Sequence, residues 1–320
     1  MMTEIKDNFD RTFKTLRVSL LNTCNLACVY CCFGNEDSKE NYRSSKGQML
    51  TADELLKLIA KLHERLDLDV VRLTGGEPLL YKQLPELVSG IRAIGINDVK
   101  LTTNGLLLEN IAPALKAAGI SSINVSLDAI EPEVYHLMSR RHDLSRTLKG
   151  IEAAHRLGIE VKINSVVMKG LNDSQILPLL AYAFQRKMKI RFLEIMAMGH
   201  LHGSADKHFF SQEEILSRID THYPASPLPR KSSSTSNYWQ TADGNVFGIV
   251  ANESEPFCSD CNRLRLDAYG NIYGCLSSNS PISILETDPQ RLDDSLREAL
   301  AQKQSIKFTG STLSMLHIGG

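Results

Sequence analysis

The cysteines of this chain fall into two groups that lie far apart in the sequence. Of the seven, four lie in one stretch and three in another, with none between. The first group is Cys24, Cys28, Cys31 and Cys32, and the second is Cys258, Cys261 and Cys275. Thiols at short, fixed spacings in a reducing compartment usually bind a metal or a cluster rather than form disulfides. We therefore expect two metal or iron–sulfur centres.

The first group places three thiols on one loop. Cys24, Cys28 and Cys31 have the spacing C-x3-C-x2-C, with Tyr30 before the last thiol. A [4Fe-4S] cluster held by three cysteines keeps one iron without a protein ligand. Such an iron can chelate the amino and carboxylate groups of S-adenosylmethionine and pass an electron to its sulfonium, which releases a 5'-deoxyadenosyl radical. The alternative is a zinc site whose fourth ligand is missing or is Cys32.

The second group also offers three thiols, and it lies beside two arginines. Cys258, Cys261 and Cys275 have the spacing C-x2-C-x13-C, with Arg263 and Arg265 just inside. A closed zinc site would need a distant fourth ligand, because the next histidine is His317. A second cluster with an open iron is the sharper interpretation. Its surroundings suit a purine nucleotide, with the base on the iron and the phosphates on guanidinium groups.

A regular alternation of strands and helices must position these loops. Each predicted strand is rich in Val, Ile, Leu or Thr, and the six are Leu16–Leu21, Asp69–Thr74, Asp98–Thr103, Ser121–Leu127, Glu160–Val167 and Lys189–Ile195. Amphipathic segments separate them, such as Thr51–Leu66, where Thr51 and Glu54 form a capping box. Parallel neighbours need crossover connections, so the pattern predicts a parallel sheet with helices outside. We expect an α/β fold, an incomplete (β/α)6 TIM-like barrel.

The pattern changes after Met196. We expect a capped helix within Ser204–His222, a Pro- and Ser-rich mobile connection over Pro224–Ser236, and a helix near Leu292–Gln302. Asp243-Gly244 and Gly270-Asn271 predict hairpins over Tyr238–Val250 and Arg263–Leu276. The chain then divides into a partial-barrel domain over residues 1–222 and a smaller α+β region over residues 223–320 that closes the open side of the barrel.

Composition excludes several classes of protein. Hydrophobic residues at 42% and charged residues at 23% are ordinary globular proportions, which exclude disordered and fibrous proteins. The 36 Lys and Arg against 37 Asp and Glu give a formal charge of -1, so net charge favours neither nucleic acid nor an anionic membrane as a partner. No apolar run approaches a membrane span or signal-peptide core. We expect a cytoplasmic protein whose anionic ligand is met by local charge.

The motifs together resemble a known family. The first cysteine loop, with Thr74-Gly75-Gly76-Glu77-Pro78, resembles radical S-adenosylmethionine enzymes. Gly75 and Gly76 would let the backbone approach the methionine moiety closely. With the second cysteine group and the terminal Gly319-Gly320, the whole chain resembles the GTP 3',8-cyclase family of molybdenum cofactor biosynthesis. That resemblance implies two [4Fe-4S] clusters, and an adenosyl radical that removes hydrogen from C3' of GTP before the ribose attacks C8.

The resemblance also implies a product, partners and site residues. The product is (8S)-3',8-cyclo-7,8-dihydroguanosine 5'-triphosphate, which cyclic pyranopterin monophosphate synthase consumes. A reducing electron donor is required, and a homodimer is one option for the assembly. The cluster ligands would be Cys24, Cys28, Cys31, Cys258, Cys261 and Cys275. S-adenosylmethionine would contact Tyr30, Gly76, Ser126 and Met196. GTP would contact Arg17, Arg72, Thr102, Lys162, Arg263, Leu264 and Arg265. Catalytic roles would belong to Arg17, Gly319 and Gly320.

Several cations in this set have an ordinary alternative, because most Arg and Lys side chains lie on the surface. Arg17, Arg72 and Lys162, however, occur in apolar strands that face the same rim, which favours function. The chain also departs from the usual family pattern at Leu21-Asn22-Thr23, at Cys32-Phe33, and at Val70, where a lysine is common. Loss of that cation costs about 1 kcal/mol or more in a triphosphate pocket, which leaves affinity and substrate identity open.

Two rival functions are open from the sequence. One is a radical enzyme that acts on a peptide with the help of an auxiliary cluster, although such enzymes usually carry more C-terminal cysteines. The other is a zinc-binding module without catalysis.

Overall fold

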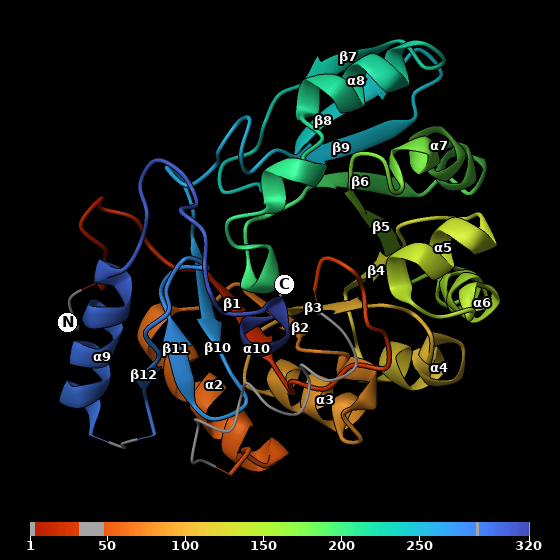
Figure 1. Cartoon of the computed structure of the whole chain (residues 1–320). Helices are drawn as coiled ribbons and strands as arrows, with labels where there is room; N and C mark the ends of the chain where they lie inside the picture. The colour runs from red at the N-terminus through yellow and green to blue at the C-terminus, as the bar shows by residue number, and fades with distance from the viewer. Residues whose placement is uncertain (1–3, 32–47, 286–287, 320) are drawn as a thin grey trace.

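The fold is seen in a computed structural model that describes residues 4–31, 48–285 and 288–319 (Figure 1). Cys32, Phe33 and Gly320 therefore lie outside the described residues. Within the described part of the chain, no helix has the length and apolar character needed to cross a membrane.

Six parallel strands form the centre of the molecule. They are β1 (Thr15–Ser19), β2 (Val70–Thr74), β3 (Asp98–Thr103), β4 (Ser122–Ser126), β5 (Glu160–Val167) and β6 (Lys189–Glu194). Each pairs in parallel with the next along the chain. The α/β partial barrel is thus confirmed, and each predicted strand matches to within about two residues.

The C-terminal half adds three strands to each edge of this sheet. The added strands are β7 (Ala225–Leu228), β8 (Asn237–Thr241), β9 (Val246–Val250), β10 (Arg263–Leu266), β11 (Asn271–Tyr273) and β12 (Ile282–Ser283). The order across the described sheet is β12-β11-β10-β1-β2-β3-β4-β5-β6-β9-β8-β7. Both predicted hairpins are confirmed, since β8 pairs with β9 and β10 with β11 in antiparallel fashion. The cysteine-bearing ribbon therefore lies directly beside β1.

One segment differs from its prediction. The sequence predicts a mobile connection over residues 224–236, but residues 225–228 form β7, paired with β8. β7 is the outermost strand on its side of the sheet, where Pro227 is tolerated because one side of an edge strand needs no donor. The proline and serines suggested a loop, and only the pairing partner reveals a strand.

Helices cover the outer face of the curved sheet (Figure 1). They are α2 (Ala52–Leu66), α3 (Leu84–Ala93), α4 (Leu108–Ala118), α5 (Pro132–Ser139), α6 (Leu144–Arg156), α7 (Ile176–Gln185) and α8 (Gln212–Asp220). The capping boxes at Thr51 and Ser211 are formed as predicted. α9 (Pro289–Ala301) lies beside β11 and β12, and α10 (Met315–Ile318) lies inside the curve of the sheet near the C-terminus. Short 3-10 turns occur at Pro78–Leu80, Asp173–Gln175, Gly199–Leu201 and Ala205–His208.

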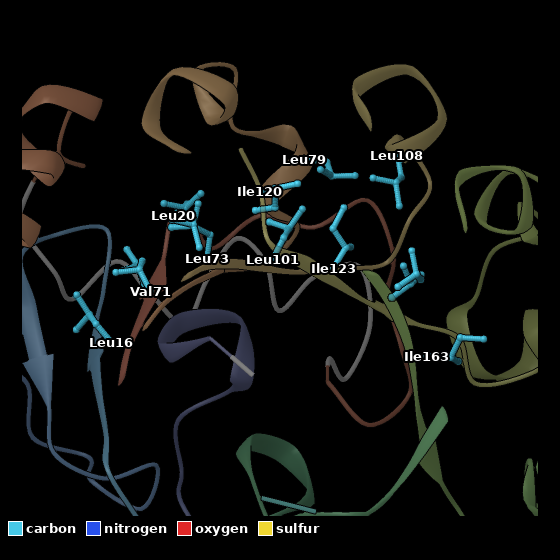
Figure 2. Close-up of a cluster of buried hydrophobic side chains, with 14 of the residues drawn as sticks. Leu16, Leu20, Val71, Leu73, Leu79, Leu101, Leu108, Ile120, Ile123 and Ile163 are labelled. Carbon is cyan, nitrogen blue, oxygen red and sulfur yellow. The ribbon is translucent and has the colours of Figure 1, made fainter. Parts of the chain in front are cut away.

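The hydrophobic core lies between the sheet and these outer helices. Figure 2 shows one part of it, in which strand side chains such as Leu16, Val71, Leu101 and Ile123 lie in a continuous layer. All four are fully buried, and burial of such a side chain contributes ~1.5–3 kcal/mol. Because strand residues alternate between faces, the residues between these apolar ones must point into the barrel.

Candidate active site

The inside of the barrel holds a cavity of about 400 Å³. Side chains from β1 to β6, from the second cysteine group and from the C-terminal tail line it. Eight lining residues are basic, namely Arg17, Arg72, Lys100, Lys162, Arg191, Arg263, Arg265 and Lys303. None of the described residues that line it is acidic. Lys100 and Lys162 pair with Asp98 and Glu160, at 2.6 and 3.0 Å, but these carboxylates do not line the cavity. The lining therefore has an excess of positive charge, which suits a polyanionic ligand.

Strand register explains how the cations meet. Arg17 on β1 pairs with Arg72 on β2 and with Arg265 on β10. Arg72 pairs in turn with Lys100 on β3. Paired residues of neighbouring strands share a face, so these four side chains form a row across the inner face of the sheet.

Two amides hold part of this row in place. With its amide oriented to hydrogen-bond, Asn124 Oδ1 accepts from Arg72 Nη1 at 2.7 Å and from Arg191 Nη2 at 2.8 Å. Arg191 also donates through Nε and Nη2 to Asn164 Oδ1, at 2.9 and 2.7 Å. Neutral amides fix the guanidinium groups without cancelling their charge, so the cations stay available to a ligand.

The three arginines of the row are buried close to other cations. Burial, reinforced by Arg265 and Arg72, lowers the pKa of Arg17 well below its ordinary value. Burial and neighbouring arginines also lower the pKa of Arg72 and of Arg265 to about 10. The Arg17 Nε is buried and has no hydrogen-bond partner. A bound phosphate would supply that partner and relieve the repulsion.

The second cysteine triad opens onto the same cavity. Cys258, Cys261 and Cys275 are half-buried and all line it. Lys303 Nζ donates to Cys261 Sγ at 3.2 Å. Burial opposes ionisation of Cys261, but Arg263 and Lys303 outweigh it and lower the pKa of this thiol to about 6. The pKa of Cys258 is raised by burial and by the other two thiols.

The first cysteine triad lies on the loop that follows β1. Main-chain bonds to the end of α5 hold this loop, since the Ala27 and Val29 amides donate to the Ser139 and Met138 carbonyls at 3.2 and 2.9 Å. The Cys31 amide donates to the Cys28 carbonyl at 2.9 Å, which folds the loop into a turn. The three thiols are half-buried, as a group that must meet a ligand requires.

The glycine pair after β2 has a packing role that the sequence did not reveal. The Gly76 amide donates to the Leu21 carbonyl at 2.6 Å. A Cβ on Gly76 would lie 2.1 Å from the Thr23 carbonyl oxygen, and one on Gly75 would lie 2.7 Å from that of Leu21. Gly75 also has φ +147. Both glycines therefore let the chain before Cys24 pack closely against the end of β2.

Two buried carboxylates lie near the first triad. Glu77 accepts from the Asn104 and Leu79 amides at 2.7 and 2.9 Å and from Thr103 Oγ1 at 2.5 Å. Burial outweighs these bonds and raises the pKa of Glu77 to about 7. Asn104 Nδ2 in turn donates to Cys24 Sγ at 3.8 Å, which connects the carboxylate to the cysteine loop.

Tyr30, between the second and third cysteines of this loop, contacts the other carboxylate. Its hydroxyl donates to Asp128 Oδ2 at 2.9 Å, and the Val166 amide donates to Asp128 Oδ1 at 2.8 Å. Burial raises the pKa of Asp128 to about 6. Burial and Asp128 raise the pKa of Tyr30 well above its ordinary value, so Tyr30 remains a neutral donor.

The C-terminal tail connects the two cysteine groups. Ser314 Oγ donates to the Cys31 carbonyl at 3.0 Å, and Met315 lines the cavity. Arg265 Nη1 donates to the Ile318 carbonyl at 3.1 Å and also to that of Gly319. Gly319 has φ +71, and a Cβ there would lie 2.4 Å from Thr74 Cγ2 at the end of β2. Gly319 therefore lies at the rim shared by β1 and β2.

Comparison with known proteins identifies the family. Residues 18–183 match the Radical SAM superfamily, and residues 188–309 match Molybdenum Cofactor Synthesis C. A GTP 3',8-cyclase of Staphylococcus epidermidis is 39% identical over 86% of this chain and 82% of its own length. One of Staphylococcus haemolyticus is 37% identical over 96% of this chain and 92% of its own length. The chain belongs to the GTP 3',8-cyclase family of radical SAM enzymes.

Solved structures support the fold of this family member. SuiB of Streptococcus suis bound to the precursor peptide SuiA covers 93% of this chain and 68% of its own, with TM-score 0.67 and 14% identity. Native anSMEcpe with bound AdoMet covers 91% of this chain and 81% of its own, with TM-score 0.59 and 16% identity. At such identities the likeness concerns the fold alone.

The structure brings together most of the residues that the sequence predicted for this family site. The predicted residues that line the cavity are Arg17, Arg72, Thr102, Lys162, Met196, Arg263, Arg265 and the three cysteines of the second group. Leu264 does not line it, because alternation along β10 turns its side chain into the core. Tyr30 is on the cysteine loop, Gly76 packs against Thr23 just before it, and Ser126 is the last residue of β4; none of the three lines the cavity.

Sequence reasoning missed Lys100, Asn124, Asn164, Arg191 and Lys303, which also line the cavity. Lys100 and Arg191 carried the same signal as Arg17 and Arg72, since each is a cation in a predicted strand, whereas the two asparagines did not stand out. Lys303 follows α9 and carries no local signal, because only tertiary packing brings it to Cys261.

The donor sets fit iron–sulfur clusters in their chemistry. Each triad supplies three half-buried thiols, the ligand set of a [4Fe-4S] cluster that keeps one iron open. Among the described residues, no three His, Cys, Asp or Glu side chains converge tightly enough to hold a single metal ion. The cluster assignment therefore rests on thiol spacing, family membership and the cations around the second triad.

Proposed function

We propose that this chain converts GTP to (8S)-3',8-cyclo-7,8-dihydroguanosine 5'-triphosphate, the first step of molybdenum cofactor biosynthesis. The observation that carries the proposal is the acid-free cationic cavity onto which the second cysteine triad opens. Its row of arginines suits a triphosphate better than a peptide, whose backbone is neutral. The names of the relatives, at 37–39% identity, agree with this substrate.

The first triad would hold the cluster that acts on S-adenosylmethionine. When bound, that cluster supplies the electron that cleaves the sulfonium to methionine and a 5'-deoxyadenosyl radical. The chain's own part is to bind and orient the cosubstrate. Tyr30, Gly76, Ser126 and Met196 are its proposed contacts. Asp128, behind this loop, has a pKa of about 6, so at neutral pH it provides the negative potential that a cationic sulfonium favours.

The cavity cations would bind the nucleotide. Arg17, Arg72 and Lys162 are the proposed triphosphate ligands, and the unpartnered Arg17 Nε is the donor most in need of an acceptor. Thr102 lines the cavity beside them. Arg263 and Arg265 lie next to the second triad, so they would hold the nucleotide while the guanine ring meets the second cluster. Leu264 contributes through its backbone, since its side chain is in the core. Arg191 lies in the same cavity as Val70, where a lysine is common in the family, and is proposed as a further phosphate ligand.

The diglycine tail is proposed to act with Arg17 in catalysis. Gly319 lies at the rim of β1 and β2, between the two triads, and Arg265 holds its carbonyl. A glycine there presents backbone polar groups to the reacting centre without a side chain in the way. Gly320, which follows it, completes the proposed tail.

The wider setting of the reaction is also part of the proposal. Reductive cleavage needs a reducing electron donor, and the cyclised product is the substrate of cyclic pyranopterin monophosphate synthase. Cysteine-bound clusters require a reducing compartment, here the cytoplasm. We further propose a barrel unit over residues 1–222, an auxiliary-cluster unit over residues 223–320, and assembly as a homodimer.

The direct test is anaerobic incubation of the reconstituted protein with GTP, S-adenosylmethionine and dithionite. We expect a cyclised GTP isomer and 5'-deoxyadenosine by mass spectrometry. Replacing GTP by ATP is the matched control, with the triphosphate kept and the base changed, and it should give no cyclised product. Metal analysis should give about eight irons per chain, as two cubanes require. Zinc without acid-labile sulfide would end the radical interpretation.

A further inference from the structure

Lys303 is a buried lysine beside the second cysteine triad. Its side chain is 6% exposed, although lysine almost never lies fully inside a protein without a partner. Its ammonium donates to Cys261 Sγ at 3.2 Å and to the Arg263 carbonyl oxygen at 2.9 Å. Neither acceptor is a carboxylate. The natural counterion for this buried charge is therefore the sulfur of the cysteine.

The segment that carries Lys303 is fixed to the cysteine ribbon from one side by α9. A Cβ on Gly274 would lie 1.7 Å from the Ala299 carbonyl oxygen in the last turn of α9. The helix end therefore packs directly on the residue before Cys275. The Lys303 amide donates to the Leu300 carbonyl at 3.0 Å, which continues this fixed geometry to the lysine itself.

The N-terminal segment fixes it from the other side. Arg11 Nη1 donates to the Gln304 carbonyl oxygen at 3.1 Å and also to that of Cys258. Arg11 is in turn held by Asp7, whose Oδ2 accepts from Arg11 Nε at 2.7 Å. One buried guanidinium thus joins the residue after Lys303 to the cysteine loop. The backbone that carries Lys303 is therefore held against the cysteine loop from both sides, and the ammonium is held by its bonds to Cys261 and to the Arg263 carbonyl.

We propose that Lys303 is a positioning residue that fixes the Cys261 sulfur and raises the reduction potential of the second cluster. The inference rests on the proposed function, which places a cluster on this triad. Thiolates give such a centre negative charge, and reduction adds more. A fixed cation and an N–H···S hydrogen bond favour the more negative, reduced form, so the potential moves in the positive direction.

A purely structural role is the competing explanation. Lys303 Nζ also lies 5.0 Å from the centre of the Phe13 ring, and it satisfies the Arg263 carbonyl. A lysine that served only these contacts would affect folding but not the electronic properties of the cluster. A redox measurement separates the two roles, because packing alone does not set a potential.

The experiment uses full-length protein in which Cys24, Cys28 and Cys31 are replaced by Ala, so that only the second cluster is present. Its midpoint potential is measured by anaerobic titration with electron paramagnetic resonance detection, without nucleotide. We expect Lys303→Met to move the potential to a more negative value, and Lys303→Arg, which keeps the charge and a donor, to stay closer to the parent. Lys100→Met is the control. It removes a cation from the same cavity, but Lys100 is paired with Asp98 at 2.6 Å on β3.

The outcomes distinguish the inference from the proposed function. If the parent binds no cluster, both are overturned. If it binds one and Lys303→Met has the parent's potential, only the role of Lys303 is overturned. A shift equal to that of Lys100→Met would also overturn it, because general charge would then explain the effect. Should Lys303→Met fail to hold a cluster, Lys303→Gln carries the test. Lys303→Gln keeps a hydrogen-bond donor but removes the charge. A potential that is more negative than that of the parent, by more than Lys100→Met produces, supports the role of Lys303. The parent's potential contradicts it.

Discussion

The two cysteine triads supply the same three ligands in different electrostatic surroundings. The first lies on a loop held by main-chain hydrogen bonds, with the buried carboxylates Glu77 and Asp128 behind it. The second lies on a ribbon at the edge of β1, with Arg263 and Lys303 against its thiols. A negative environment favours a cationic sulfonium, and a positive one favours a polyphosphate. The surroundings thus assign different ligands to centres whose thiols alone would not distinguish them.

Removal of one cysteine ligand from each triad should have the largest effects on activity and should separate the roles of the two triads. We expect Cys24→Ala to abolish 5'-deoxyadenosine formation, because the first cluster loses a ligand and the electron path to the sulfonium with it. Cys275→Ala should retain part of the cleavage but lose cyclisation. Both products are quantified from the same reaction by mass spectrometry. Full cyclase activity in Cys275→Ala would show that the second triad has no role toward the substrate.

Substitution of one glycine beside each triad should reduce the same two activities, cofactor cleavage and cyclisation, through steric overlap alone. A Cβ on Gly76 meets the Thr23 carbonyl at 2.1 Å, and one on Gly274 meets the Ala299 carbonyl at 1.7 Å. Both neighbours are backbone, so the chain itself must move, at a cost of about 1–3 kcal/mol or more. We expect Gly76→Ala to reduce 5'-deoxyadenosine formation and Gly274→Ala to reduce cyclisation with cleavage largely retained.

Iron content and the two product yields, measured together, check this pair of variants. Equal loss of both products in Gly274→Ala would mean that the ribbon and the first loop depend on one another. The two triads would then not have separate roles in cleavage and cyclisation.

Loss of a single cavity cation should have a smaller effect. Arg17→Ala removes a buried guanidinium whose Nε lacks a partner until a ligand arrives. One charged hydrogen bond contributes about 1.5–3 kcal/mol, which is about a 10- to 100-fold loss in kcat/KM for GTP. Arg297→Ala is the control, since that side chain is 50% exposed and pairs with Asp294 outside the cavity. Steady-state kinetics at saturating S-adenosylmethionine measure both. An unchanged kcat/KM in Arg17→Ala would remove Arg17 from the nucleotide site.

Much of the fold could be predicted from local signals. Thr51 with Glu54, and Asp243-Gly244, carry their structure in a few neighbouring residues, and the corresponding helix start and hairpin are confirmed. Residues 225–228 could not be predicted as a strand, because only the long-range pairing with β8 defines them. Short-range chemistry is readable from sequence, whereas sheet edges depend on partners elsewhere in the chain.

The cavity shows the same division. Arg17 and Arg72 stand out as cations in apolar strands, but Asn124 and Asn164 look like ordinary polar positions of a half-exposed strand. Only closure of the sheet turns that face inward and makes their amides part of a network with Arg191. Lys303 is harder still to predict, because it follows α9 and reaches Cys261, 42 residues earlier in the chain, only through tertiary packing.

The last expected effect is on stability rather than on activity, and it concerns the Glu77 carboxyl group behind the first triad. Burial raises the pKa of Glu77 from 4.5 to about 7. Between pH 4.5 and about 7 the folded protein therefore binds more protons than the unfolded chain. The stability that this group contributes falls as the pH rises through that range. The full difference corresponds to ~3 kcal/mol for a buried group.

We expect Glu77→Gln, which does not titrate, to flatten this part of the stability profile in cluster-free protein. Chemical denaturation of the parent and the variant at pH values across that window measures the effect. The quantity of interest is the change in slope rather than the absolute stability, because the new amide also loses an acceptor for Thr103 or Asn104. Parallel profiles for the two proteins would contradict the raised pKa and would mean that the Glu77 carboxyl is ionised in the folded protein at neutral pH.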